Sequence, residues 1–335
     1  MTPAKSMGLV SVVIPCYNQE RYLGEALQSI FSQTYPRIEV IVVDDGSEDA
    51  TASIARGFGD RIRFMQQQNR GASAARNLAL SACSGEYVQF LDGDDKIESA
   101  KILRQVEFLE QNRDTGIVYS DVRYFSDIAP DERSLGPYIL EEGRPWTPMH
   151  WEAPGTMLEK LIKRNILAIN SALVRRDAVV AVGPWNEKLF AVEDWEYWIR
   201  CAVAGVKFSY QDWPGTLSLV RLHPASTSAN LARVDLGVFQ MRVHLSRILK
   251  DPRSRATNCK LAIQACERLP SSDRRRRFLE LARATHGLAN HLRVIAAWLL
   301  FTHWLDRRLR RLLRRTVPWP IQRTFARILD KAPPS

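Results

Sequence analysis

The sequence predicts an α/β protein built on a mostly parallel sheet with helices on both faces. Over the first 120 residues, short apolar runs rich in β-branched residues alternate with segments whose apolar residues recur at helical spacing. Such alternation is typical of β–α–β units, whose crossovers place helices on both faces of the sheet. In addition, two acidic clusters each follow an apolar run directly, as expected of side chains at the carboxyl-end edge of one sheet.

The elements are expected in a regular order over this first part of the chain. The expected strands lie at 9–14, 39–43, 62–65 and 87–91, and the expected helices lie around 22–31, 72–79 and 102–109. Residues 120–165 are less regular and rich in proline, which predicts a long excursion rather than a linker. A helix is then expected over 193–204, strands near 207–210 and 216–222, and helices beyond about 235.

The bulk composition is that of an ordinary globular protein. Of the 335 residues, 45% are hydrophobic and 25% are charged, which gives ample material for a core. The five cysteines are odd in number and none has CxxC spacing, so we expect a reducing compartment and neither a disulfide framework nor a zinc site. The N-terminal apolar run is interpreted as a strand rather than a signal peptide, and no apolar stretch reaches the roughly 18 residues of a membrane span.

The net charge of +10 is unevenly distributed along the chain. Residues 1–235 hold 25 basic and 31 acidic residues, whereas residues 236–335 hold 22 basic and 6 acidic residues. We therefore expect an acidic body followed by a basic helical extension. Within that extension, 293–315 combines an apolar stripe with six arginines at 307–315, which is typical of a helix on an anionic membrane surface. The alternative is a helical pair packed on the body; nucleic acid is not expected, because no binding motif accompanies the charge.

Two acidic motifs imply a ligand at the edge of the sheet. The sequence DDGS at 44–47 suits helix capping, but two carboxylates also accept hydrogen bonds well from a nucleobase and a ribose. In LDGDD, at 91–95, carboxylates spaced one residue apart suit Mg²⁺ or Mn²⁺, which leave other coordination positions to water and substrate phosphates. A polar turn is the alternative for this second motif. Together the motifs imply a nucleoside diphosphate bridged by a divalent metal.

Three stretches of the chain resemble the family 2 glycosyltransferases, which have the GT-A fold, a Rossmann-like and mostly parallel sheet flanked by helices. The stretches are SVVIPCYNQE from residue 11, NRGASAARN from residue 69 and FAVEDWEYWIR from residue 190, and the resemblance covers 9 to about 225. It implies transfer of a sugar, with inversion, from a nucleotide-diphosphate donor to a hydroxyl of a glycan or lipid-linked acceptor. A UDP-sugar is the favoured donor.

The resemblance also implies roles for single residues. The expected contacts of the donor nucleotide are Pro15, Tyr17, Asp44, Asp45, Arg76 and Asp92, supported by Asn77. The expected metal ligands are Asp94 and His223, with Arg221 beside the diphosphate, whereas Asp95 has no firm role.

The third stretch supplies the expected catalyst. Asp194 matches the acid that acts as general base on the acceptor hydroxyl, and Glu193 precedes it in support. Taken without the resemblance, this acidic pair is explained by favourable charge at a helix N-terminus. Trp146, Trp151 and Trp185 are candidates for stacking on acceptor sugars, or alternatively cover the core.

The combined expectation is a metal-dependent inverting glycosyltransferase of cell-envelope or exopolysaccharide synthesis, cytoplasmic and peripheral on the inner face of the membrane. Its donor half is expected at about 9–120 and its acceptor half at about 120–235, both within a catalytic domain over 1–235. One alternative is a non-catalytic subunit that binds nucleotide-sugar or glycan. Another is a sugar nucleotidyltransferase, which needs a glycine-rich basic loop where this chain has PCYNQE. A dehydrogenase is not expected, because no GxGxxG opens the first helix.

Overall fold

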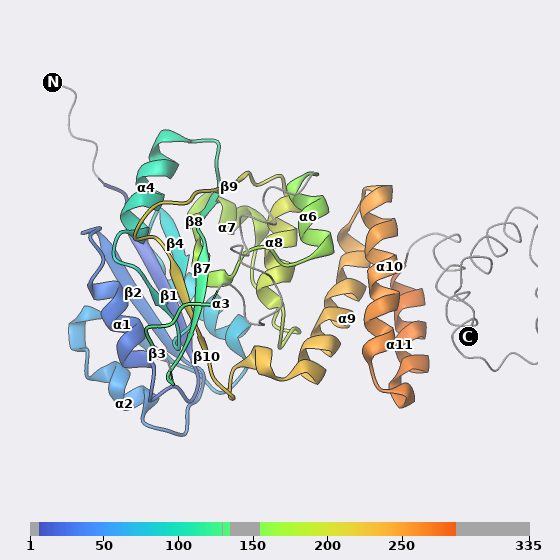
Figure 1. The fold of residues 1–335 in the computed structure, drawn as a ribbon, viewed down its shortest axis with the longest axis horizontal. Coiled ribbons are helices and arrows are strands. Elements are labelled where there is room, and N and C mark those ends of the chain that lie inside the picture. Colours follow the sequence, from blue (N-terminus) through green and yellow to red (C-terminus); the bar gives the residue numbers. More distant parts are fainter. Residues whose placement is uncertain (1–6, 129, 135–154, 286–335) are drawn as a thin grey trace, which may run out of the picture. The chain divides into compact units, whose positions relative to one another are not determined.

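The structure is a computed structural model, and it describes residues 7–128, 130–134 and 155–285. The chain divides into two compact units, Met1–Met241 and Arg242–Ser335. The first unit has the predicted α/β architecture, with a mainly parallel sheet between layers of helices (Figure 1).

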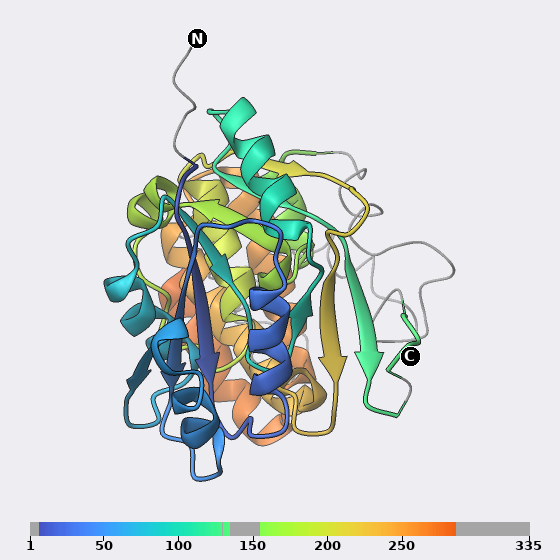
Figure 2. The ribbon, with the colours of Figure 1, turned by 90° about the vertical axis from the view of Figure 1, so that its left-hand side faces the viewer.

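The main sheet has seven strands in the order β3-β2-β1-β4-β8-β6-β9. Their bounds are β1 (Val10–Cys16), β2 (Ile38–Asp44), β3 (Arg63–Gln66), β4 (Tyr87–Phe90), β6 (Ile117–Tyr119), β8 (Ala172–Arg175) and β9 (Phe208–Tyr210). All pairs are parallel except those of β8, which runs antiparallel to both β4 and β6. Because β1 lies between β2 and β4, the carboxyl ends of these three strands lie at one edge of the sheet (Figure 2).

The first unit also contains a second, three-stranded sheet. It has the order β5 (Lys96–Ile97), β10 (Ser218–Leu222) and β7 (Val122–Ser126), with β10 antiparallel to β5 and parallel to β7. The short strand β5 follows the second acidic motif at once. Pairing with β10 therefore brings the residues just after β10, including His223, beside that motif although they are far away in the sequence.

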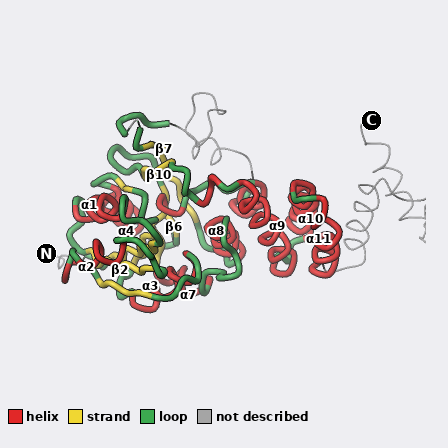
Figure 3. The backbone as a smooth tube through the Cα atoms, turned by 90° about the horizontal axis from the view of Figure 1, so that it is seen from below, coloured by secondary structure: helices red, strands yellow, loops and turns green. Residues whose placement is uncertain are grey.

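Helices cover both faces of the main sheet. Those of the first unit are α1 (Leu23–Phe31), α2 (Thr51–Arg56), α3 (Ala72–Ala82), α4 (Lys101–Gln111), α6 (Met157–Lys163), α7 (Arg176–Val182) and α8 (Glu193–Val203). Figure 3 shows α1 and α4 on one side of the strands and α3 and α7 on the other. The buried residues of α1 and α4 form one apolar core with alternate residues of β1 and β2, as the period of two in a strand requires.

The expected strands and helices of the first 120 residues are confirmed to within a few positions, and the expected helix over 193–204 is α8. Three 3-10 turns complete this unit: η1 (Gly59–Arg61), η2 (Ile169–Ser171) and η3 (Thr227–Ala229). All five cysteines are buried and none forms a disulfide. The boundary at 235 between a catalytic domain and an extension stays a prediction.

The described part beyond 230 is helical, as the sequence predicts. It comprises α9 (Leu231–Ile248), which begins in the first unit and ends in the second, α10 (Pro252–Arg268) and α11 (Ser271–Ala284). The expected membrane-surface helix over 293–315 lies outside the described residues. Among the helices that are described, none combines the length and the hydropathy needed to cross a membrane.

Candidate active site

The two acidic motifs lie on either side of β1 at one edge of the sheet, as predicted. Asp44 is the last residue of β2, and Asp92 follows β4 by two positions. Between them, β1 ends with Pro15 and Cys16, both buried, and is followed by Tyr17, whose side chain is 44% exposed. The exposed ring of Tyr17 is accessible at this edge, and its stacking role stays a prediction.

Asp44 does not face a ligand, so its predicted role as a base contact is wrong. Its carboxylate is fully buried, and one oxygen accepts hydrogen bonds from the main-chain N–H of Ser47 at 3.1 Å and from the Ser47 hydroxyl at 2.5 Å. The other oxygen accepts from Gln66 Nε2 at 2.8 Å. Asp44 therefore stabilises the turn after β2.

Asp45 fixes the segment that leads into α3. Its Oδ1 accepts from Gln67 Nε2 at 2.6 Å and from the Arg70 N–H at 2.9 Å, and its Oδ2 accepts from the Gly71 N–H at 2.7 Å. Gly71 has φ +88, a backbone conformation that favours glycine. Because each carboxylate oxygen has two lone pairs, Oδ2 retains capacity for one more donor. A base contact by Asp45 stays a prediction.

The turn of the second motif places Asp94 against His223. The two side chains meet with Asp94 Oδ2 at 3.0 Å from His223 Nε2, and the His223 ring packs on Tyr22 with centroids 4.8 Å apart. A Cβ added at Gly93 would lie 2.1 Å from the side-chain oxygen of Gln19 and 3.2 Å from the Cβ of Cys16, so a side chain here would force Gln19 to move. The partial exposure of Asp94, 18% of its side chain, leaves room for a ligand.

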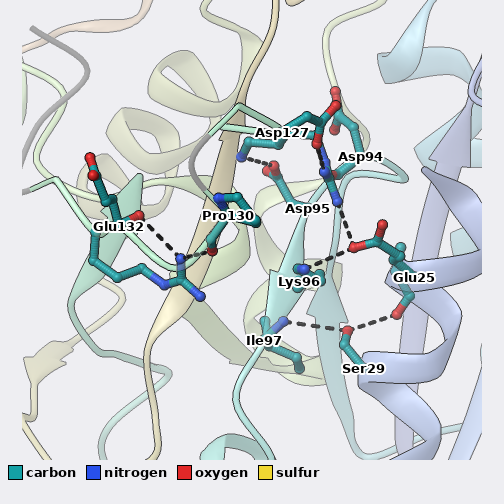
Figure 4. A network of polar contacts seen from close by, with 12 residues as sticks. Glu25, Ser29, Asp94, Asp95, Lys96, Ile97, Asp127, Pro130 and Glu132 are labelled. Atoms are coloured by element: carbon teal, nitrogen blue, oxygen red, sulfur yellow. Dashed lines mark hydrogen bonds and ion pairs between the residues drawn. The ribbon is translucent and has the colours of Figure 1, made fainter. Parts of the chain in front are cut away.

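Arg221 holds this turn in place instead of reaching a diphosphate, which corrects its predicted role. It is 4% exposed, and its Nε donates to the main-chain oxygen of Asp94 at 2.9 Å while its main-chain N–H donates to Asp95 Oδ1 at 2.7 Å. Its guanidinium also pairs with Glu25, at 2.9 Å, and with Asp127. Figure 4 shows these four acidic residues gathered around one point. Arg221 is therefore a positioning residue for Asp94.

Asn170, which the sequence analysis missed, supports the same turn from η2. It is 1% exposed, accepts a hydrogen bond from the Asp92 N–H at 3.1 Å through its Oδ1, and donates to the carboxylate of Asp95. Burial, together with the charges of Asp94 and Asp92, raises the pKa of Asp95 well above its usual value. Asp95 faces the protein interior and is part of this support.

Arg76 joins the second acidic motif to the start of α8. Its Nη2 lies 2.7 Å from Asp92 Oδ1 and its Nη1 lies 2.9 Å from Glu193 Oε1, while its side chain is 2% exposed. The guanidinium carbon also lies 4.9 Å from the centre of the Trp185 ring. Burial alone would lower the pKa of Arg76, but the charges of Asp92 and Glu193 raise it, so the bridge stays charged.

Asp194, the predicted base, lies in the first turn of α8. Its Oδ2 accepts a hydrogen bond from Asn165 Nδ2 at 3.0 Å and its Oδ1 from the Trp195 N–H at 2.6 Å. Burial raises the pKa of Asp194 to about 7, the charge of Glu193 adds to this, and the two hydrogen bonds oppose it. A base with a pKa near the working pH is well suited to accept a proton during reaction.

Val192 immediately precedes this helix in a strained conformation. Its φ of +57 places a β-branched residue in the left-handed region, which only glycine and a few polar residues adopt readily. Such strain, of order 1–3 kcal/mol, persists only where surrounding contacts enforce it and is concentrated at functional sites.

Trp185 cannot stack on an acceptor, so that prediction is wrong. It is 2% exposed, with Tyr197 stacked on its ring at 4.1 Å and 8°. Asn77 fixes it by accepting from the Trp185 N–H at 2.8 Å and donating to the Trp185 oxygen at 3.1 Å. Asn77 thus supports the segment before α8 rather than the nucleotide. The other two candidates, Trp146 and Trp151, lie outside the described residues.

The residues at the second motif fit a divalent cation with few protein ligands. No group of three or more His, Cys, Asp or Glu side chains arranged to hold a metal exists within the described ranges. Asp94 and His223 do offer a carboxylate and an imidazole side by side. Mg²⁺ and Mn²⁺ are commonly held by one or two protein ligands, with water and substrate phosphates completing the shell.

Comparison with known proteins agrees with this arrangement. The family model "Glycosyl transferase family 2" matches residues 11–181. An uncharacterized glycosyltransferase of Haemophilus influenzae is 39% identical over 249 residues, which cover 70% of this chain and 88% of that protein. One of Rickettsia typhi is 32% identical over 224 residues, which cover 66% of each chain.

Two solved structures share the fold at low sequence identity. Staphylococcus aureus TarS 1–349 in complex with UDP-GlcNAc has a TM-score of 0.59 at 17% identity, covering 82% of this chain and 80% of that one. The mannosyltransferase PcManGT of Pyrobaculum calidifontis, in complex with GDP-Man and Mn²⁺, has a TM-score of 0.56 at 19% identity, covering 96% and 84%. The matching family model and the relatives together show that the chain belongs to glycosyltransferase family 2.

Proposed function

We propose that this protein is an inverting glycosyltransferase that moves a sugar from a nucleotide-diphosphate donor, with UDP-sugars preferred, to a hydroxyl of a glycan or lipid-linked acceptor. The observation that carries the proposal is the buried ion-pair bridge of Arg76, which connects the metal and ribose motif to the helix of the candidate base. The related folds bind UDP-GlcNAc in TarS and GDP-Man with Mn²⁺ in PcManGT, which supports a donor of this class.

In the proposed reaction, Asp194 accepts the proton of the acceptor hydroxyl. The freed oxygen attacks the anomeric carbon from the face opposite the diphosphate, so the bond to the leaving oxygen breaks as the new bond forms and the configuration inverts. Because burial brings the pKa of Asp194 to about 7, the carboxylate is present near neutral pH and still basic enough to accept the proton. Asn165 and the Trp195 N–H hold its two oxygens in place.

The donor is proposed to lie across the carboxyl ends of β1, β2 and β4. Tyr17 stacks on the nucleobase, Asp45 accepts from it, and Asp92 binds the ribose through the oxygen that Arg76 leaves free. Asp94 and His223 would hold a divalent cation, Mn²⁺ or Mg²⁺, which when bound neutralises charge on the leaving diphosphate.

The proposed location of the protein in the cell rests on its charge alone. Residues 236–335 hold 22 basic and 6 acidic residues, and this positive balance suits attraction to an anionic membrane surface. This would place the protein on the cytoplasmic face of the cell membrane, where lipid-linked or exopolysaccharide glycans are assembled.

Thermal unfolding with nucleotide-sugars tests the donor site. We expect a UDP-sugar with Mn²⁺ to raise the melting temperature, Asp94→Ala to lose the metal-dependent part, and Asp194→Asn to keep the stabilisation but lose donor turnover. No stabilisation of the wild type by UDP-, GDP-, dTDP- or CMP-sugars would refute the donor site. Turnover that is unaffected in Asp194→Asn would refute its role as the base and favour another enzyme class. Stabilisation of the wild type by a donor without any turnover would favour the non-catalytic binding subunit.

A further inference from the structure

One aromatic ring in the segment before α8 is left in solvent. Phe190 is 55% exposed, whereas its neighbours Leu189 and Ala191 are 5% and 2% exposed. The segment is closely packed around this ring: an added Cβ on Gly71 would lie 3.6 Å from it, and one on Gly237 of α9 would lie 2.9 Å from the Ala191 oxygen. The ring is therefore exposed on a closely packed part of the chain.

A cation without an anionic partner lies beside this ring. The guanidinium carbon of Arg233, in the first turn of α9, lies 5.8 Å from the centre of the Phe190 ring. Arg233 is exposed, and no carboxylate among the residues that the structure describes pairs with it. The nearby arginines differ, since Arg70 pairs with Glu187 at 2.6 Å and Arg76 is buried between two carboxylates.

In the sequence, Phe190 and Arg233 lie close to residues of the candidate active site. Phe190 precedes Asp194 by four positions, and Arg233 follows His223 by ten. The strained backbone of Val192 lies between the exposed ring and the first turn of α8. Phe190 also lies beside Gly71, whose main-chain N–H donates to Asp45 of the first acidic motif at 2.7 Å.

We propose that Phe190 and Arg233 form an acceptor subsite for a sugar that carries a negative charge. The ring packs against the C–H face of the sugar, and the guanidinium binds a phosphate or carboxylate of the same acceptor through paired hydrogen bonds. This inference rests on the proposed glycosyl transfer and names the class of acceptor: a hydroxylated, anionic glycan or polyol. It also assigns to Phe190 the stacking role that the buried Trp185 cannot perform.

The test measures binding of three acceptor probes to the UDP- and Mn²⁺-loaded protein by titration NMR. The probes are methyl α-D-glucopyranoside, its 6-phosphate and methyl α-D-glucuronide, and the variants are Phe190→Ala, Phe190→Tyr, Arg233→Gln and Arg233→Lys. Val180→Ala and Arg113→Gln are matched controls, because these side chains are also exposed, at 73% and 67%, but belong to other surfaces. Melting temperatures confirm that each variant is folded.

We expect the wild type to bind an anionic probe about tenfold more tightly than the neutral one, the usual size of a charge-assisted hydrogen-bond effect. Arg233→Gln should abolish this preference, and Arg233→Lys should retain part of it. Phe190→Ala should weaken all probes and Phe190→Tyr should not. Preference for the phosphate or for the glucuronide identifies the anion.

The proposal is overturned if the wild type binds the neutral probe equally well, if it binds no probe, or if Arg233→Gln keeps the preference. The donor site is judged separately, by stabilisation of the wild type with UDP-sugar and no probe present. Failure of that measurement refutes the proposed function, whereas failure of the probe preference alone refutes the acceptor subsite.

Discussion

Replacing Arg76 by glutamine should weaken both the fold and the link between the donor motif and the base. Removal of one partner from a buried ion pair costs about 3–5 kcal/mol, because the other charge is left without compensation. Asp92 and Glu193 keep 33% and 16% of their side chains exposed, so water replaces part of the lost interaction. We therefore expect a loss of about 3 kcal/mol in the free energy of unfolding. For a unit of this size, that corresponds to a fall of about 6–12 °C in melting temperature.

A cycle of substitutions isolates the bridge from general destabilisation. Asp92→Asn and Glu193→Gln are made singly and together, in the wild type and in Arg76→Gln, and both melting temperature and donor hydrolysis are measured. Both carboxylates act through Arg76. In the wild-type background we therefore expect the effects of Asp92→Asn and Glu193→Gln on the free energy of unfolding to be coupled by about 1 kcal/mol, and in Arg76→Gln we expect them to be additive. Arg104→Gln, which breaks an exposed pair with Glu107, is the control and should cost less than about 0.5 kcal/mol. Additive effects in both backgrounds would refute the bridge.

Three further predictions concern titration and the metal. Asp194→Asn should lower donor turnover by about 100- to 10,000-fold. Because burial raises the pKa of Asp194 to about 7, wild-type kcat/KM should fall as the pH drops below about 7. A pH profile of kcat/KM that stays flat down to pH 5 would contradict this role. Substitution of Asp94 or His223 by alanine should raise the Mn²⁺ concentration needed for half-maximal stabilisation by UDP, measured by thermal shift, and unchanged concentrations would exclude them as ligands. Burial lowers the pKa of Lys101 well below its usual 10.5, so the unfolded chain binds more protons and stability should rise with pH towards 10.5; denaturant unfolding of wild type and Lys101→Met, whose slope with pH should be smaller, checks this.

The fold and the acidic motifs could be predicted because they depend on contiguous sequence. The alternation of apolar periods identified the strands around β1, and a motif such as LDGDD carries its own spacing. Asn165 and Asn170 could not be found in this way, because each acts on a residue that another segment brings to it, 29 positions away for Asn165 and 78 for Asn170.

The wrong predictions share a different cause, which is burial. The sequence shows that Trp185 and Asp44 are near the site but not whether their side chains face the ligand or the protein. Tyr197 covers the Trp185 ring, and the carboxylate of Asp44 accepts hydrogen bonds from Ser47, in the turn after β2, and from Gln66 of β3. Arg221 shows the same limit, since it is 4% exposed and its guanidinium pairs with Glu25 and Asp127.

Two contacts of the candidate active site join residues that are far apart in the sequence, which has consequences for synthesis of the chain on the ribosome. His223 follows its partner Asp94 by 129 positions, and Glu193 follows Arg76 by 117. The sheet formed by β1, β2, β3 and β4 is complete in sequence long before either partner has been translated, so a nascent chain of this length lacks His223 beside Asp94 and Glu193 beside Arg76. The contact between Asp94 and His223 can therefore form only when residue 223 has left the exit tunnel.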